Sequence, residues 1–297
     1  MTDIRCMLCG SNLNKKILQI GKLSLLGCIN CKLMWLWPQT TSGTSRDYHK
    51  SLVIEPYIEY MEPLRVKQYK QEIENLSQMT SGKLLLDVGC AAGWFLKEVH
   101  ETGFVTWGIE PQKKLAAMAK KNSPKSNVLV GNLDTILKYR EKFDVVTLWS
   151  VFEHFKDPQK SLLTLNKILK KGGVIAIRTP NSRGMAQIVS FILFRLSRGK
   201  ISFPVKSVLQ YDFESKHWFL FNQKNLEILL RKHGFEKVKV YYSTSVDWKN
   251  IEIWLESRKI RLNVLFIMIM KLGFLVIGII GNTFRLTDDF VLFAVKK

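Results

Sequence analysis

Beyond residue 82, short apolar runs alternate with amphipathic segments, a pattern typical of a mostly parallel sheet covered by helices. The runs that we expect to form strands are Leu84–Val88, Val105–Ile109, Val128–Val130, Phe143–Trp149, Val174–Arg178, Phe235–Tyr242 and Val291–Val295. Helical spacing of apolar residues predicts helices at Trp94–Glu101, at Leu115–Lys121, after Asp157-Pro158 as far as Gly172-Gly173, and from Asn222 to Gly234. The expected fold class is therefore α/β, with a doubly wound sheet.

Near the amino terminus the chain carries two C-x2-C pairs, eighteen residues apart. Their members are Cys6, Cys9, Cys28 and Cys31. Two such pairs can supply the four sulfurs at about 2.3 Å that tetrahedral Zn²⁺ prefers, and they leave no open position for substrate. The alternative is a pair of disulfides or plain buried cysteines. Because no export signal precedes them, we expect a cytoplasmic protein without disulfides, and we predict a structural Zn²⁺ in a zinc-ribbon module.

The first predicted strand ends in a turn of small residues. Its spaced members are Asp87, Gly89, Ala91 and Gly93. Such a turn lets the backbone approach a ligand at the amino end of the next helix. Glu110 ends the second strand 23 residues after Asp87, where an acid can accept hydrogen bonds from both ribose hydroxyls of an adenosine-containing cofactor. The turn lacks the G-x-G-x-x-G of a dinucleotide site, which favours a cofactor without phosphates.

The motifs of this region resemble, in order and spacing, those of class I S-adenosylmethionine-dependent methyltransferases. They are DVGCAAG at Asp87–Gly93, GIEP at Gly108–Pro111, GNL at Gly131–Leu133, FDVV at Phe143–Val146, FEH at Phe152–His154 and LKKGG at Leu169–Gly173. They cover about Lys83–Arg178, and Ala91 stands where the usual turn has glycine. The resemblance implies a Rossmann-like methyltransferase sheet with S-adenosylmethionine as cofactor.

The resemblance also implies which residues hold that cofactor. They are Gly89, Ala91 and Gly93 beside its methionine part, Asp87 as organiser of that turn, Glu110 at the ribose, Asn132 and Leu133 beside the adenine, and Trp149 and Ser150 closing over it. The alternative for Glu110 is a plain surface acid.

A second resemblance covers more of the chain. The four-cysteine module, the sequence TPN at Thr179–Asn181 and the sequence HWFLF at His217–Phe221 are similar to a subgroup with an N-terminal zinc-binding module. Lys32 departs from the glycine that usually follows the last cysteine there. The subgroup includes sugar C-methyltransferases and related small-molecule enzymes. This resemblance implies methyl transfer to a small acceptor, such as a sugar, a lipid or a lipid-linked intermediate.

Two histidines are candidate catalytic bases, because an acceptor hydroxyl or acidic carbon needs a base that works near neutral pH. His154 and His217 both fall on the side of the sheet where ligands bind in open α/β folds. His154 could instead shape its loop, and His217 could be a core residue beside its aromatic neighbours. His100 and His233 stand at helix ends, where capping is expected, and His49 lies in a linker region.

Charge bears on the partner. The chain has 45 Lys and Arg against 25 Asp and Glu, a net charge of +20, and Pro158–Tyr211 has ten basic residues and no acid. Within that stretch Ile188–Val205 mixes apolar and basic residues, which suits an anionic membrane or a phosphorylated, lipid-linked substrate. A lid packed on the core is the alternative.

A second apolar segment lies near the carboxyl end. Leu262–Ile280 would form a helix of about 28 Å, but Lys271 at its middle opposes spanning of a bilayer. We expect an interfacial, re-entrant or dimer-buried helix pair broken at Lys271–Gly273, and peripheral contact at the cytoplasmic face of a membrane.

These patterns predict five regions: a zinc-ribbon module at 1–40, a linker and helix at 41–80, a cofactor-binding core at 81–181, an insertion or substrate lid at 182–221, and the rest of the sheet at 222–297 with an apolar helical segment at 262–281. Two other functions stay open. An RNA methyltransferase would also show zinc knuckles and strong positive charge, although its basic stretches should be interleaved with aromatic residues rather than aliphatic ones. A non-catalytic scaffold could retain the same fold.

Overall fold

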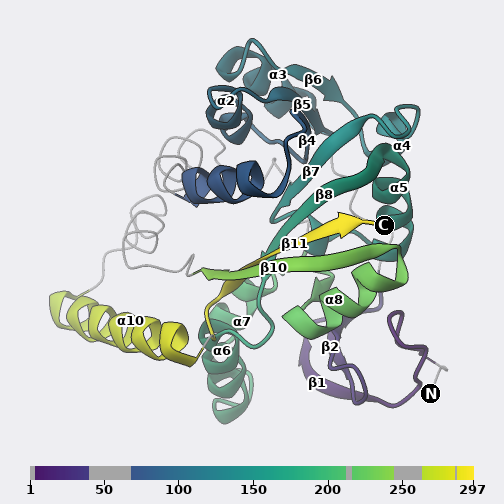
Figure 1. Ribbon diagram of the computed structural model, residues 1–297. Coiled ribbons are helices and arrows are strands. Elements are labelled where there is room, and N and C mark those ends of the chain that lie inside the picture. The colour runs from purple at the N-terminus through teal and green to yellow at the C-terminus, as the bar shows by residue number, and fades with distance from the viewer. Residues whose placement is uncertain (1–3, 40–67, 212–215, 244–262, 285) are drawn as a thin grey trace. The chain divides into compact units, whose positions relative to one another are not determined.

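The computed structural model describes residues 4–39, 68–211, 216–243, 263–284 and 286–297 (Figure 1). The chain divides into two compact units. The first unit consists of Met1–Thr40, Pro180–Asn225 and Tyr241–Val291, and the second consists of Thr41–Thr179, Leu226–Val240 and Leu292–Lys297. His49 and most of the predicted linker at 41–80 lie outside the described residues, whereas residues 68–79 are helical.

The larger sheet has seven strands in the order β10-β11-β8-β7-β4-β5-β6. Their bounds are β4 Leu84–Val88, β5 Val105–Glu110, β6 Asn127–Val130, β7 Phe143–Trp149, β8 Leu169–Pro180, β10 Phe235–Ser243 and β11 Asp289–Lys296. The pairs β4·β5, β5·β6, β4·β7 and β7·β8 are parallel. The chain runs from β4 outward to β6 and then returns to the other side of β4 as β7. This reversal confirms the predicted doubly wound α/β fold and creates a switch point between β4 and β7, where open α/β sheets bind ligands.

Helices flank these strands because the central strands are apolar on both faces. The helices around the sheet are α2 Trp94–His100, α3 Lys113–Asn122, α4 Leu133–Ile136, α5 Pro158–Ile168 and α8 Gln223–Lys232, and a 3₁₀ turn, η1, covers Phe152–His154. Asp157 caps α5, since its Oδ1 accepts a hydrogen bond from the Lys160 amide. The helix ends at Ile168 rather than at Gly172-Gly173, because β8 begins at once at Leu169.

A separate four-stranded sheet lies in the first unit, in the order β1-β2-β3-β9. Its strands are β1 Asn14–Ile20, β2 Leu23–Cys28, β3 Met34–Trp37 and β9 Phe219–Leu220. The pair β3·β9 is antiparallel, with Trp35 opposite Phe219, and the Leu36 amide donates to the Trp218 carbonyl at 2.9 Å. The four-cysteine module is therefore joined by strand pairing to a segment about 180 residues further along the chain.

The remaining helices of the first unit are α6 Met185–Leu196, α7 Phe203–Val208 and α10 Val264–Phe284. The sequence led us to expect a break at Lys271–Gly273, and this expectation is wrong, because α10 is a single helix of 21 residues. One glycine costs a helix interior only about 1 kcal/mol relative to alanine, which does not suffice to end it. Among the described residues, no helix has both the length and the apolar character needed to cross a bilayer.

Candidate functional site

The turn after β4 is held against two neighbouring strands. Asp87 is 3% exposed, and its Oδ1 accepts a hydrogen bond from the Thr147 hydroxyl of β7 at 2.7 Å. Gly89 has a φ of +72°, and its amide donates to the Ile109 carbonyl of β5 at 2.8 Å. A Cβ at Gly89 would lie 2.6 Å from the Val151 side chain, so this position requires glycine. Hydrogen bonds to β5 and β7 thus fix the backbone of the turn, and Gly89 adds no side chain to it.

Ala91 is a non-glycine residue with a positive φ in this turn. Its φ of +45° lies in the left-handed region, where an L-residue with a Cβ is strained by roughly 1–2 kcal/mol. Its amide donates to Glu110 Oε2 at 3.1 Å, which ties the turn to the end of β5. Gly93 follows at a φ of +81°, and a Cβ there would lie 2.8 Å from Ala119 Cα of α3.

Glu110 places a buried carboxylate at the end of β5. It is 6% exposed, and its Oε1 also accepts a hydrogen bond from the Gln112 amide at 3.0 Å. Burial raises the pKa of this carboxyl to about 7, and the two amide hydrogen bonds act against that rise. Each oxygen of an ionised carboxylate can accept a further hydrogen bond, so Glu110 has the capacity to hold two ligand hydroxyls.

The third and fourth strands of the expected site end in structured turns. Asn132 follows β6 and caps α4, with its Oδ1 accepting from the Asp134 amide at 3.0 Å and from the Thr135 amide at 3.4 Å. Sequence reasoning assigned Asn132 and Leu133 to the adenine and missed this capping box. At the end of β7, Trp149 packs edge-on against Phe95 with ring centroids 5.0 Å apart.

Ser150, which follows Trp149, has a φ of +56°. Its amide donates to the Arg178 carbonyl at 3.1 Å, so a hydrogen bond to β8 holds the strained backbone in place. Strain of this kind concentrates at ligand sites. Together, the residues named for the cofactor stand at the carboxyl ends of β7, β4, β5 and β6, four strands that are adjacent in this order. That these residues bind the cofactor stays a prediction.

The two candidate bases belong to different units. His154 ends η1 in the second unit, and its amide donates to the Val151 carbonyl at 3.0 Å. His217 lies in the first unit, is 6% exposed, and places Nδ1 2.8 Å from the Val208 carbonyl. A carbonyl can only accept, so Nδ1 carries the hydrogen and Nε2 is the basic nitrogen of the neutral ring. A catalytic role for either histidine stays a prediction.

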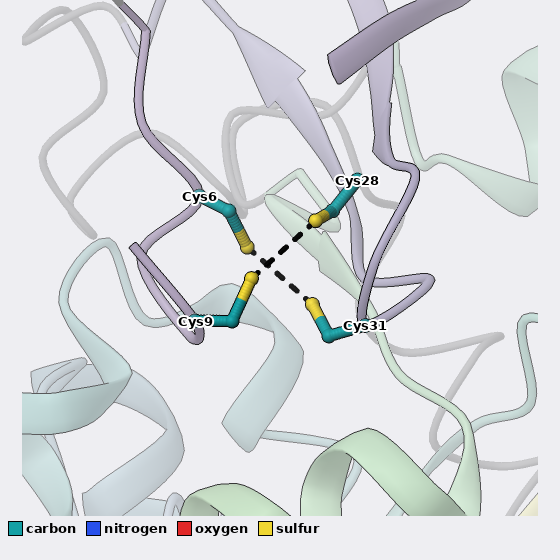
Figure 2. Close-up of side chains that lie close together, drawn as sticks. All are labelled: Cys6, Cys9, Cys28 and Cys31. Carbon is teal, nitrogen blue, oxygen red and sulfur yellow. Dashed lines mark hydrogen bonds between the residues drawn. The ribbon is translucent and has the colours of Figure 1, made fainter. Parts of the chain in front are cut away.

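The four predicted metal ligands converge in the first unit, as Figure 2 shows. Cys6 Sγ lies 3.5 Å from Cys31 Sγ, and Cys9 Sγ lies 3.5 Å from Cys28 Sγ. These distances exceed the bond length of a disulfide, about 2.05 Å, and approach the separation of about 3.8 Å between sulfurs of a tetrahedral Zn²⁺ site. All four cysteines are free, and all four sulfurs lie within 4.8 Å of one another. The cluster therefore fits Zn²⁺ and rules out the disulfide alternative in this structure.

The two halves of the cluster share one backbone geometry. The Gly10 amide donates to the Cys6 carbonyl at 2.8 Å, and the Lys32 amide donates to the Cys28 carbonyl at 3.1 Å. Gly10 and Lys32 both have a positive φ, of +73° and +60°. Lys32 therefore occupies a left-handed position that glycine adopts without strain.

One buried ion pair escaped sequence reasoning. Arg178 of β8 donates to Glu72 and, at 2.7 Å, to Gln68 Oε1, and the Arg178 and Glu72 side chains are 7% and 4% exposed. All three residues lie in the second unit. The sequence could not show this pair, because 106 residues separate its two charges.

Comparison with known proteins agrees with this geometry. The sequence profile of a family described as "Methyltransferase domain" matches residues 57–240. Two curated relatives, both ubiquinone biosynthesis O-methyltransferases, come from Coxiella burnetii (strain RSA 493) and Actinobacillus pleuropneumoniae (serotype 7). The first is 25% identical over 134 residues, 44% of this chain and 55% of the relative, and the second is 28% identical over 133 residues, 42% and 55%. This chain thus spans about half the length of the curated relatives it matches.

Solved structures share the fold. A SAM-dependent methyltransferase from Archaeoglobus fulgidus superposes with a TM-score of 0.52 at 18% identity, covering 82% of this chain and 99% of that one. A magnesium protoporphyrin IX methyltransferase from Synechocystis, crystallised with bound SAH, gives a TM-score of 0.51 at 11% identity and covers 83% and 88%. At these identities the likeness concerns the fold alone.

Proposed function

Because this chain belongs to the methyltransferase-domain family, we propose that it transfers a methyl group from S-adenosylmethionine to a small-molecule acceptor. The observation that carries the proposal is the buried carboxylate of Glu110 at the end of β5, bonded through the Ala91 amide to the small-residue turn after β4. When bound, S-adenosylmethionine supplies a methyl group on a cationic sulfur, so the protein mainly has to align the acceptor.

The resemblance gives each cofactor residue a proposed task, and the contacts of Glu110 and Asp87 support theirs. Glu110 accepts the ribose hydroxyls, and Asp87 keeps the turn in place through its bond to Thr147. Gly89, Ala91 and Gly93 present backbone to the methionine part, Asn132 and Leu133 flank the adenine, and Trp149 and Ser150 close over the cofactor. We also propose that Cys6, Cys9, Cys28 and Cys31 hold a structural Zn²⁺ in a zinc-ribbon module.

The test of cofactor binding is a calorimetric titration with S-adenosylmethionine. Replacing Glu110 by glutamine removes the charge from two charge-assisted hydrogen bonds, each of about 1.5–3 kcal/mol, so we expect affinity to fall about a hundredfold or more. Glu141→Gln, at an exposed acid of the same unit, is the matched control and should bind as the wild type does. If the wild-type protein binds no S-adenosylmethionine, the scaffold alternative is favoured instead.

The acceptor is proposed to be a sugar, a lipid or a lipid-linked intermediate. The subgroup resemblance and the acid-free basic stretch Pro158–Tyr211 support this class. Incubation with methyl-labelled cofactor and fractionated cell extract tests it, because label should enter the lipid or the sugar-nucleotide fraction. Label that enters RNA would establish the RNA methyltransferase alternative.

We propose His154 or His217 as the base that accepts a proton from the acceptor. With a labelled acceptor fraction in hand, His154→Asn and His217→Asn separate the two. Loss of a general base lowers kcat by about 10²–10⁴-fold while S-adenosylmethionine still binds. If the lost kcat of a variant recovers as the pH is raised, hydroxide in the solvent is removing the acceptor's proton in place of the missing histidine. That recovery identifies the replaced histidine as the base. If neither variant lowers kcat, no histidine of this pair is the base.

Peripheral membrane contact is proposed for the first unit, at the cytoplasmic face. Leu196 at the end of α6 is 78% exposed and Phe203 at the start of α7 is 54% exposed, with exposed Arg198 and Lys200 between them. Apolar side chains beside cations suit a surface of anionic lipid. Sedimentation with phosphatidylserine vesicles should fall in the Leu196→Ser/Phe203→Ser variant, and equal sedimentation would exclude this face.

A further inference from the structure

A small cavity of about 130 Å³ lies within the first unit. None of its lining residues is among those proposed to hold the cofactor. Its polar lining comes from three separate segments: Asn181 and Arg183 after β8, Asn222, Gln223 and Lys224 at the start of α8, and Tyr242 of β10. Phe284 and Leu286 form an apolar wall. No aspartate or glutamate is among the lining residues that the structure describes.

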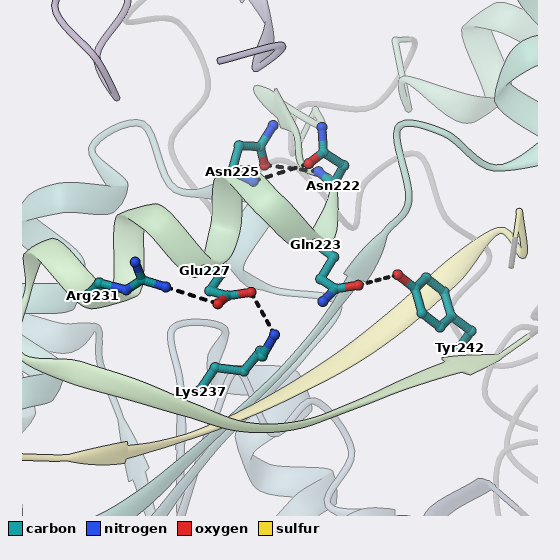
Figure 3. A network of polar contacts seen from close by, with 7 residues as sticks. All are labelled: Asn222, Gln223, Asn225, Glu227, Arg231, Lys237 and Tyr242. Atoms are coloured by element: carbon teal, nitrogen blue, oxygen red, sulfur yellow. Dashed lines mark hydrogen bonds and ion pairs between the residues drawn. The ribbon is translucent and has the colours of Figure 1, made fainter.

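The amide side chains of this cavity are oriented by bonds that occupy their oxygens (Figure 3). The Tyr242 hydroxyl donates to Gln223 Oε1, and the Asn225 amide donates to Asn222 Oδ1 at 3.1 Å. The Arg183 amide likewise donates to Asn181 Oδ1 at 3.0 Å. The N–H₂ groups of Asn222 and Gln223 are therefore turned away from these bonds and can donate to a ligand, while each oxygen has one lone pair already engaged.

Asn222 presents an unused donor to the cavity. The residue is 7% exposed, and its Nδ2 makes no hydrogen bond within the described part of the chain. Nδ2 is not fully buried, so a ligand that enters the cavity can reach it. Its partner Asn225 is fully buried and bonds back to it, because Asn225 Oδ1 accepts from the Asn222 amide at 2.9 Å. The side chain is thus locked with its unused donor in the cavity wall.

Two cations complete the lining. Arg183 and Lys224 have exposed side chains, and neither pairs with a carboxylate among the residues that the structure describes. Lys224 stands in the first turn of α8, where a positive charge opposes the helix dipole and an anion is favourable. Asp288, the acid next but one to Leu286, is directed elsewhere, since its Oδ1 accepts from the Ala186 amide of α6 at 3.0 Å.

We propose that this cavity binds the phosphate group, or a like oxyanion, of a ligand, and that this ligand is the methyl acceptor; the second part rests on the proposed function. Cations, amide donors and a helix amino end supply several charge-assisted hydrogen bonds and no repulsion. The wall of Phe284 and Leu286 accommodates an apolar part next to the phosphate. The phosphate can belong to a soluble metabolite or to a lipid headgroup.

Titration of the full-length protein with inorganic phosphate, by calorimetry, tests the site directly. Asn222→Asp keeps an oxygen acceptor for the Asn225 amide and replaces the free N–H₂ by a repelling carboxylate, so the fold should persist while phosphate binding falls at least about tenfold. The Arg183→Gln/Lys224→Gln variant should show the same loss. The control is Lys15→Gln/Lys16→Gln, which removes two exposed charges from the same unit and should bind phosphate within about twofold of wild type.

Thermal melting confirms that each variant is folded. Equal phosphate affinity in Asn222→Asp and wild type overturns the proposal, as does an equal loss in the Lys15/Lys16 control, which would reveal general charge attraction. Binding of S-adenosylmethionine to the same variants is measured separately and should not change. If the protein binds phosphate but not S-adenosylmethionine, the proposed function is wrong and the phosphate site stands. If it binds S-adenosylmethionine but not phosphate, only the phosphate site is wrong.

Two further arms identify the source of the phosphate. If the ligand is soluble, glucose 1-phosphate should bind more tightly than inorganic phosphate, and Asn222→Asp should abolish that gain. If it is a lipid headgroup, sedimentation with phosphatidic acid vesicles should fall in Asn222→Asp while neutral phosphatidylcholine vesicles bind neither protein. Either result supports the site. If Asn222→Asp changes neither glucose 1-phosphate binding nor vesicle sedimentation, the proposed site is wrong.

Discussion

The turn after β4 in the second unit and the donor-lined cavity in the first unit are built in opposite ways. The turn is formed by contiguous backbone with two buried acids, Asp87 and Glu110, whose oxygens accept hydrogen bonds. The cavity collects side chains from distant segments, and these present N–H groups and positive charge. Such a pair suits two ligands of unlike chemistry: a cofactor that offers hydroxyl donors and a second molecule that offers an anion.

Removal of the proposed Zn²⁺ should separate the two sites most strongly. The cysteine module belongs to the same unit as the cavity, and its strand β3 pairs with β9, which ends two residues before Asn222. Structural zinc contributes about 10–16 kcal/mol to the folding of small zinc domains, so chelation should unfold this module. Phosphate binding should be lost, whereas binding of S-adenosylmethionine to the second unit should survive.

Metal analysis and the two titrations, before and after chelation, measure this outcome. Restoring Zn²⁺ should restore phosphate binding, which is the control against irreversible damage. A preparation that holds no stoichiometric zinc, and whose phosphate binding survives chelation, would contradict the prediction.

Breaking the Arg178–Glu72 pair should act on the second unit instead. Glu72→Gln leaves the Arg178 charge buried at 7% exposure, and an uncompensated buried charge of this kind costs about 3–5 kcal/mol. We expect cofactor binding to be lost at a lower temperature, while phosphate binding in the first unit persists to the wild-type temperature.

Glu236→Gln is the matched control for this prediction. It breaks the pair of Glu236 with Lys297 in the same unit, whose side chains are 69% and 63% exposed, and exposed pairs contribute about 0–1 kcal/mol. Urea unfolding curves of both variants supply the free energies. Equal destabilisation by the two substitutions would mean that the buried pair contributes no more to the free energy of unfolding than the exposed pair.

The contrast between the sites also explains what the sequence could reveal. The strands of the large sheet follow from contiguous apolar runs, and the turn at Asp87–Gly93 with Glu110 is encoded within about two dozen residues. The four cysteines are similarly legible, since spacing alone indicates a metal site. Local periodicity and local spacing carry this information, because the residues that cooperate are near one another in the chain.

Contacts between distant segments produce no local pattern in the sequence. The pairing of Trp35 with Phe219 and the bond from Tyr242 to Gln223 depend on tertiary arrangement, so neither periodicity nor spacing could indicate them. The break expected at Lys271–Gly273 failed for a related reason, because a weak local preference was taken to outweigh the cooperativity of a 21-residue helix. The residues that meet at the turn after β4 could thus be predicted from the sequence, and those that line the cavity could not.

The pH dependence of binding should distinguish the two sites by about tenfold. Burial raises the pKa of Glu110 to about 7 in the free protein, and the ionised form is the better acceptor for ribose hydroxyls. A ligand that selects the ionised form should bind about tenfold more weakly at pH 6 than at pH 8, because the ionised fraction drops from about nine-tenths to about one-tenth. Sulfate, which keeps its charge over this range, should bind the cavity with nearly constant affinity.

Calorimetry at pH 6, 7 and 8 in a constant ionic strength checks both slopes. Glu110→Gln should remove the slope for S-adenosylmethionine and leave weak, pH-independent binding. A cofactor affinity that is already constant from pH 6 to pH 8 in the wild type would show that Glu110 does not bind the cofactor as an anion.

The smallest expected effect compares two turns that carry the same kind of strain. Ala91 in the turn after β4 and Lys32 in the cysteine cluster both have a positive φ, at positions where the resembled families usually have glycine. Substitution by glycine removes roughly 1–2 kcal/mol of strain but adds about 0.5–1 kcal/mol of unfolded-state entropy. Ala91→Gly and Lys32→Gly should therefore each stabilise their unit by about 0.5–1 kcal/mol.

Ala116→Gly is the control for this pair of turns, because Ala116 lies inside helix α3, where the backbone is helical and glycine relieves no strain. It should destabilise the second unit by about 2 kcal/mol, because the loss of a buried methyl group adds to the lower helix propensity of glycine. Denaturant melts of the three variants decide the matter. A gain at the two turns with a loss at Ala116 ties the gain to backbone conformation, and a loss at all three would mean that the surrounding hydrogen bonds already relieve the strain.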